Sequence, residues 1–185
     1  MESDFERLRS LIASRAVEVR PEGFVLASGI RSSLYIDLRR ITQDPEGINL
    51  AGRMVLSKIR EMFPEARFVG GLETGAIPIS TAVTMLSFSA DHKGELSAFW
   101  VRKKQKDHGL QNMVEGNLDK GGLAVIVEDT ATTGGSSLQA VEEVRRFGAE
   151  VLGVIAVVDR GAAKNLEKAG VKFVSLFKEE DLAKR

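Results

Sequence analysis

Apolar residues recur along the chain at two spacings, one helical and one typical of buried strands. Near the start, Phe5, Leu8, Leu11 and Ile12 fall on one helical face and predict an amphipathic helix over residues 4–19. Further along, short apolar runs predict strands at 24–26, 34–38, 67–71, 96–101, 123–127, 151–158 and 171–176. Helical patterns lie between most of these runs, at 45–62, 77–86, 136–147 and 162–169. Such alternation predicts an α/β fold with a mainly parallel sheet flanked by helices.

Capping and turn residues set the expected helix ends. Asp44 followed by Pro45 is typical of a helix start, and Gly148 and Gly170 are typical of helix ends. Residues 102–119 are polar and carry no clear pattern. Because loops of this length inside a compact domain are usually functional, this stretch is a candidate for chemistry.

Composition narrows the classes of function. Lys plus Arg and Asp plus Glu both number 26, and this zero net charge argues against nucleic-acid binding through a broad basic surface. The chain has no cysteine, which excludes disulfides and thiol catalysis, and its two histidines are too few for a His-rich metal centre. No apolar run is long enough to span a membrane, and Met1–Arg9 lacks a signal-peptide core. We therefore expect one domain, residues 1–185, in the cytoplasm, with no nucleic-acid or membrane partner.

The strongest chemical signal follows the strand predicted at 123–127. Glu128 and Asp129 come directly after it, and a turn rich in Thr, Gly and Ser leads into a helix. In parallel sheets, ligands bind at the carboxyl ends of strands. Backbone N–H groups at Gly134 and Gly135, with a helix N-terminus, suit a phosphate monoester, and paired carboxylates can accept hydrogen bonds from a sugar diol. The segment therefore predicts a cradle for ribose 5-phosphate, and it matches neither a Walker A loop nor a dinucleotide fingerprint.

Two other segments could hold anions. Residues 102–109 concentrate Arg102, Lys103, Lys106 and His108, although such a charge run is often only a solvated loop. Residues 70–78 form a second small-residue turn between a strand and a helix, where backbone N–H groups can bind an anion. A plain glycine-rich turn explains that second segment nearly as well.

Two single residues suit a planar, anionic base. Tyr35, the only tyrosine, can pack on a flat ring, or can simply be half-buried in a hairpin. Arg160 follows the apolar strand 151–158 and can bind a carboxylate through two parallel hydrogen bonds, or can form a surface salt bridge.

Taken in order, these segments resemble the type I phosphoribosyltransferases. Residues 125–136 match that family's signature for phosphoribosyl pyrophosphate (PRPP), in which apolar residues precede two acids and a Thr-Gly-rich turn. The Arg-Lys-x-x-Lys-Asp-His-Gly run at 102–109 is similar to the catalytic loop of the orotate phosphoribosyltransferases. The resemblance spans about residues 23–177. It implies the type I fold, with a small N-terminal hood formed by about residues 1–40 and C-terminal elements.

The resemblance also implies an activity, which is transfer of ribose 5-phosphate from PRPP to orotate in pyrimidine biosynthesis. The residues it implies for PRPP binding are Arg102, Lys103, Lys106, His108, Glu128, Asp129, Thr130, Ala131, Thr132, Thr133, Gly134, Gly135 and Ser136. The implied catalytic residues are Lys103, Lys106, His108 and Asp129. The implied pyrophosphate loop is Glu73, Thr74, Gly75 and Ala76, and the implied orotate contacts are Tyr35, Thr132 and Arg160.

Cofactor and partner are implied in the same way. The resemblance implies Mg²⁺ held mainly by PRPP, without direct protein ligands, and a homodimer whose basic loop closes over the partner's site. Three positions depart from the family pattern. Ala27 replaces a lysine found in many relatives, and Gly75 replaces a lysine found in some. The acid or amide that usually follows the arginine is missing after Arg160.

Two alternatives remain at this stage. One is a phosphoribosyltransferase for another base, such as a purine, against which Arg160 and the basic loop argue. The other is a PRPP-sensing regulator without catalysis, against which the two loop lysines, Lys103 and Lys106, argue.

Overall fold

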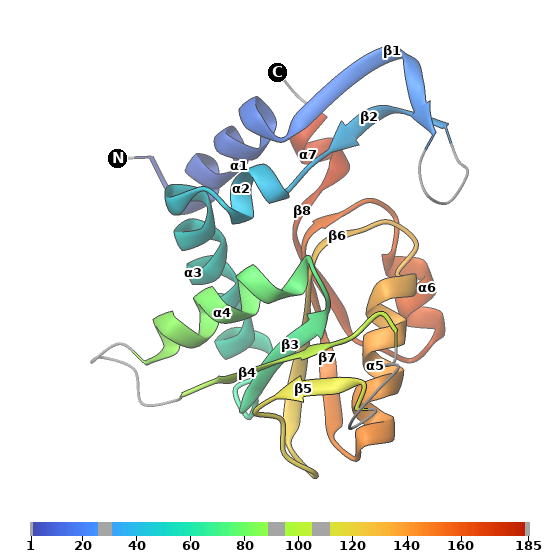
Figure 1. Ribbon diagram of the computed structural model, residues 1–185. Coiled ribbons are helices and arrows are strands. Elements are labelled where there is room, and N and C mark those ends of the chain that lie inside the picture. Colours follow the sequence, from blue (N-terminus) through green and yellow to red (C-terminus); the bar gives the residue numbers. More distant parts are fainter. Residues whose placement is uncertain (1, 26–30, 89–94, 105–111, 184–185) are drawn as a thin grey trace.

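The main body of the protein is a six-stranded sheet (Figure 1). The computed structural model describes residues 2–25, 31–88, 95–104 and 112–183. The strands are β3 (Phe68–Leu72), β4 (Ser97–Val101), β5 (Val114–Gly116), β6 (Leu123–Ala131), β7 (Glu150–Asp159) and β8 (Phe173–Lys178), in the order β5-β4-β3-β6-β7-β8. All neighbours pair in parallel except β5, which runs antiparallel to β4 at one edge. The predicted mainly parallel α/β sheet is confirmed.

Helices cover both faces of this sheet (Figure 1). On one face lie α3 (Pro45–Met62) and α4 (Ala76–Ser87), and on the other lie α5 (Gly135–Phe147) and α6 (Ala163–Lys168). Strand β6 shows why its sequence is apolar throughout. Val125 and Val127 belong to the core cluster that includes α3 and α4, whereas Ala124 and Ile126 belong to the cluster under α5. Because side chains alternate along a strand, burial on both faces requires an unbroken apolar run.

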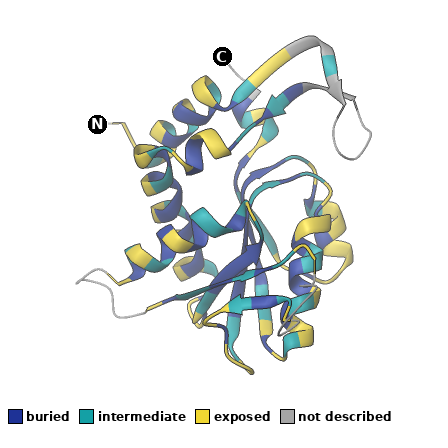
Figure 2. Ribbon diagram, viewed as in Figure 1, coloured by how far each residue is buried: buried dark blue, intermediate teal, exposed yellow. Residues whose placement is uncertain are grey.

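The remaining elements gather beside the carboxyl ends of the parallel strands (Figures 1 and 2). They are α1 (Asp4–Arg15), the antiparallel pair β1 (Val17–Val25) and β2 (Arg31–Ile36), α2 (Arg39–Thr42) and α7 (Glu179–Ala183). The two ends of the chain meet here, since the rings of Phe5 and Phe177 lie 4.7 Å apart. The hood assignment for these elements stays a prediction.

The predicted N-terminal helix is too long. The helix ends at Arg15, and β1 begins at Val17, which pairs with Ile36 of β2. Val19 continues the helical spacing of Ile12 and Ala16, but Val17, Glu18 and Val19 also alternate as in a strand. Pairing with a distant strand decides between the two.

Other local predictions hold or fail for identifiable reasons. The helix predicted at 45–62 is confirmed, and the Asp44 carboxylate accepts hydrogen bonds from the N–H groups of Glu46 and Gly47 at 3.1 and 2.9 Å. Residues 102–119 are not wholly a loop, because β5 forms within them, and residues 105–111 lie outside the described part of the chain. Short helices α2 and α7 escaped prediction because four or five residues carry too little pattern. Within the described ranges, no helix combines the length and apolarity needed to cross a membrane.

Gly71 offers a test of how closely the central strands approach. A Cβ added there would lie 2.3 Å from the carbonyl oxygen of Val127 and 2.8 Å from Cβ of Ala76. We expect Gly71→Ala to lower the free energy of unfolding by about 1–3 kcal/mol through overpacking, measured by urea denaturation. The matched change Gly135→Ala, whose Cβ would meet only Thr133 Oγ1 at 3.6 Å, serves as the control. Equal destabilisation of the two variants would contradict the packing argument.

Candidate active site

Two adjoining cavities lie at the carboxyl ends of the parallel strands. The first, named here the Arg160 cavity, has a volume of ≈ 310 Å³ and is lined by Tyr35, Ile36, Glu128, Thr130, Ala131, Thr132, Thr133, Gly134, Gly135, Ser136, Ser137 and Arg160. The second, named the Lys103 cavity, measures ≈ 480 Å³ and is lined by Arg39, Thr42, Gln43, Leu72, Glu73, Thr74, Gly75, Pro78, Lys103, Glu128, Asp129, Thr130 and Ser136. The cavities share Glu128, Thr130 and Ser136, so one ligand can extend through both.

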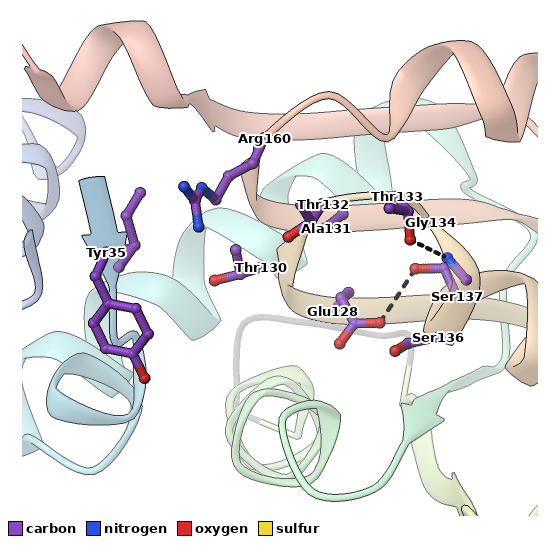
Figure 3. A pocket seen from close by; sticks show the side chains of 12 residues that line it. Tyr35, Glu128, Thr130, Ala131, Thr132, Thr133, Gly134, Ser136, Ser137 and Arg160 are labelled. Atoms are coloured by element: carbon purple, nitrogen blue, oxygen red, sulfur yellow. Dashed lines mark hydrogen bonds between the residues drawn. The ribbon is translucent and has the colours of Figure 1, made fainter. Parts of the chain in front are cut away.

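The turn after β6 is built to present backbone N–H groups. Gly134 has φ of 80°, a left-handed conformation that favours glycine, and α5 starts at the next residue. Thr133 stabilises the turn, because its Oγ1 accepts a 3.4 Å hydrogen bond from N–H of Gly135 (Figure 3). Its carbonyl accepts a second hydrogen bond, of 2.9 Å, from the Asn165 side chain. The N-terminus of a 13-residue helix therefore borders the Arg160 cavity, where it favours an anion.

The two acids at the end of β6 are held at an electrostatic cost. Glu128 is buried, and this burial together with the neighbouring Asp129 charge raises the pKa of Glu128 to about 8. A 3.2 Å hydrogen bond from Ser137 Oγ to Glu128 Oε2 opposes that rise (Figure 3). Burial also raises the pKa of Asp129, while the Thr130 N–H, 2.6 Å from Asp129 Oδ1, opposes it. Near neutral pH the pair therefore retains a proton.

The loop after β3 positions the start of the basic segment. The Glu73 carboxylate accepts a 2.8 Å hydrogen bond from N–H of Lys103, and the Gln139 side chain donates to the Lys103 carbonyl at 3.3 Å. Lys103 thus lines the cavity beside Asp129. A Cβ at Gly75 would lie 2.7 Å from Asp129 Oδ1, so any side chain there would displace the carboxylate. The peptide bond between Glu73 and Thr74 is cis.

Arg160 reaches the cavity from the end of β7 and is almost enclosed, with 6% of its side chain exposed. Its Nε and Nη2 donate to the two Glu179 carboxylate oxygens at 2.9 and 3.3 Å, and Nη2 also donates to the Leu34 carbonyl at 3.0 Å. Its backbone N–H donates to the Ala131 carbonyl at 2.8 Å. Arg160 and Tyr35 lie at one end of the cavity, and the Thr132–Ser136 turn lies at the other (Figure 3).

Most residues singled out from the sequence meet in these cavities. The cavities contain Tyr35, Glu73, Thr74, Gly75, Lys103, Arg160 and every residue from Glu128 to Ser136. Ala76 is instead fully buried. Arg102 lines neither cavity, and its Nη1 lies 3.8 Å from Glu115 Oε1 on β5. Lys106, His108 and Ala27 lie outside the described residues.

Sequence reasoning missed several contributors. Arg39, Thr42 and Gln43 line the Lys103 cavity from α2, and Glu179 pairs with Arg160 from α7. Arg39 stands four residues after Tyr35, which the sequence analysis did single out, so its position was the available signal. Glu179 had no such signal, because 19 residues separate it from Arg160.

Comparison with known proteins agrees with this geometry. The phosphoribosyl transferase domain matches residues 37–182, which defines the class of protein. Orotate phosphoribosyltransferase of Aquifex aeolicus is 42% identical over 180 residues, covering 96% of each chain, and that of Streptomyces avermitilis is 47% identical over 160 residues, covering 85% and 86%. The Mycobacterium tuberculosis orotate phosphoribosyltransferase crystallised with PRPP superposes with a TM-score of 0.79 at 34% identity, covering 98% of this chain and 100% of that one. The chain belongs to the orotate phosphoribosyltransferase family.

The buried acids make stability depend on pH. Glu128 binds a proton more tightly in the folded than in the unfolded chain, so its contribution is full below the unfolded pKa and is lost as pH rises through about 8. We expect Glu128→Gln to reduce the loss of stability between pH 5 and 9 relative to the wild type, measured as urea midpoints at matched pH. A variant whose profile runs parallel to that of the wild type would show that Glu128 is not protonated on folding.

Proposed function

We propose that this protein transfers ribose 5-phosphate from PRPP to orotate, giving orotidine 5′-monophosphate and pyrophosphate, as a step of pyrimidine biosynthesis. The observation that carries the proposal is the shared wall between the two cavities. Glu128 and Thr130 line both, with a phosphate-binding turn on one side and a lysine on the other. Family membership gives independent support.

PRPP fits this arrangement by charge. Its 5′-phosphate would bind the Thr132–Ser136 turn, where backbone N–H groups and the α5 N-terminus favour an anion. Its ribose hydroxyls would face Glu128 and Asp129, and a protonated Glu128 can donate as well as accept a hydrogen bond. The pyrophosphate group would then extend into the Lys103 cavity.

The donor set also suits Mg²⁺. Carboxylate oxygens of Glu128 and Asp129 border the Lys103 cavity, and Mg²⁺ prefers such oxygens together with substrate phosphates. We propose that the metal is held mainly by PRPP oxygens. When bound, it supplies charge neutralisation on the pyrophosphate group.

The reaction needs positioning more than covalent catalysis. A ring nitrogen of orotate attacks the anomeric carbon of the ribose as the bond from that carbon to pyrophosphate breaks, and the two cavities hold both reactants in line. Lys103 would stabilise charge on the departing pyrophosphate. The resemblance assigns Lys106 and His108 to the same task, which remains a proposal because they lie outside the described residues.

We propose that Arg160 binds the orotate carboxylate, with Tyr35 against the ring and Thr132 nearby. Its charge is partly balanced by Glu179, which accepts hydrogen bonds from two of its nitrogens. The acid or amide that usually follows this arginine in the family pattern is missing, and Glu179 supplies a carboxylate from a different element. Orotate would therefore share Arg160 with Glu179.

We also propose a homodimer with shared sites. Arg102 is implied in PRPP binding, yet it lies beside Glu115 outside both cavities of its own chain. A basic segment that serves the partner's site is consistent with that position. The single domain with its hood and the cytoplasmic location remain predictions from the sequence.

The direct test is loss of near-ultraviolet orotate absorbance on mixing the protein with orotate, PRPP and Mg²⁺. We expect a loss that requires both PRPP and metal, with orotidine 5′-monophosphate as product. Adenine, guanine and hypoxanthine in place of orotate test the purine alternative. Binding of PRPP without turnover of any base would instead favour a regulator.

Arg160 and Glu179 form a matched pair for testing the orotate contact. Replacing Arg160 by Gln removes both the ion pair and the proposed carboxylate contact, and we expect KM for orotate to rise at least about tenfold, the effect of one charge-assisted contact. Replacing Glu179 by Gln removes the same ion pair but keeps the arginine, so we expect KM for orotate to stay level or fall. Equal increases in KM for orotate in both variants would show that Arg160 only joins β7 to α7 through its ion pair with Glu179.

A further inference from the structure

The Lys103 cavity has a second cationic wall, supplied by α2. Arg39, the first residue of α2, lines this cavity together with Thr42 and Gln43, whereas Lys103 lines it from the end of β4. These two cations come from parts of the chain that only the tertiary fold brings together. No role for Arg39 follows from the resemblance that identified Lys103.

Asp37 holds the Arg39 side chain in one orientation. Arg39 Nε and Nη2 donate to Asp37 Oδ1 and Oδ2 at 2.7 and 3.1 Å, and the Arg39 backbone N–H donates to Oδ1 at 3.2 Å. Nη1 makes no hydrogen bond to any residue in the described part of the chain. The guanidinium is therefore tethered along one edge, and the residue lines the cavity with 66% of its side chain exposed, so its remaining donors are accessible to a ligand.

The positive charge of Arg39 affects the pKa of Asp129, which lines the same cavity. Burial raises the pKa of Asp129, and the positive charge of Arg39 is among the influences that lower it again. Arg39 and Asp129 also line the same cavity, so Arg39 lies close enough to act on a group bound there. A planar guanidinium suits the adjacent oxygens of a phosphate chain better than a lysine does.

We propose that Arg39 binds the pyrophosphate group together with Lys103, with Asp37 as its positioning residue. This inference rests on the proposed function for the location of pyrophosphate, and it adds a residue and a tether that the family motifs leave unassigned. Two cations from different parts of the chain would then share the neutralisation of the departing anion.

The experiment measures pyrophosphate binding directly, so it does not depend on turnover. Isothermal titration calorimetry with inorganic pyrophosphate and Mg²⁺ is performed on the wild type, Arg39→Gln and Arg40→Gln. Arg40 is the matched control, because it is adjacent and exposed, lines neither cavity, and donates to the Arg15 carbonyl at 3.2 Å. We expect Arg39→Gln to raise the Kd for pyrophosphate about tenfold, the effect of one charge-assisted hydrogen bond, and Arg40→Gln to leave it unchanged.

A second ligand and a second variant distinguish a specific loss of pyrophosphate binding from a general disruption of the site. Ribose 5-phosphate, which would bind the Thr132–Ser136 turn, should bind Arg39→Gln as it binds the wild type. Asp37→Asn keeps the positive charge but weakens its tether, so pyrophosphate affinity should fall by less than in Arg39→Gln.

Three outcomes would overturn the inference: an unchanged pyrophosphate Kd in Arg39→Gln, an equal loss in Arg40→Gln, or an equal loss of ribose 5-phosphate binding. If the wild type binds pyrophosphate through Arg39 but converts no orotate, the proposed function fails while the assignment of Arg39 stands.

Discussion

The structure depends on keeping two adjacent carboxyl groups, Glu128 and Asp129, at the buried end of a central strand. Removing such groups from water is costly, and the raised pKa values of both acids express that cost. Their neighbours limit it in three ways. Ser137 and the Thr130 N–H donate hydrogen bonds, Gly75 leaves room for the Asp129 carboxylate, and Arg39 adds a positive charge. The residues that provide this stabilisation also line the two cavities.

Positive charge is placed locally in a chain with no net charge. Lys103 and Arg39 border the cavity assigned to pyrophosphate, whereas Arg160 borders the other and is balanced by Glu179. Two cations therefore border the cavity where the more highly charged group is proposed to bind, and one borders the cavity proposed for orotate. Each of the two arginines is oriented by a carboxylate that accepts two of its hydrogen bonds, Asp37 for Arg39 and Glu179 for Arg160.

The elements beside the sheet are joined to it through functional residues. Arg160 contacts β2 through the Leu34 carbonyl and α7 through Glu179, while its backbone binds the Ala131 carbonyl at the start of the phosphate-binding turn. The Phe5 and Phe177 rings join α1 to β8 beside this point. The same contacts that border the candidate site thus hold the N-terminal and C-terminal elements together, so the proposed site and the packing of these elements share residues.

The sequence alone determined the central sheet, most helices and the acid–turn–helix cradle, because these follow from local periodicity and from residues adjacent in the chain. Helix 45–62 with its Asp44 cap and the apolar run of β6 are such cases. Only the tertiary structure decided the end of α1 at Arg15, because pairing with β2 competes with helical spacing there. It alone also brought Arg39 and Lys103 to the lining of one cavity and Glu179 to Arg160, since contacts between residues far apart in sequence leave no spacing to read.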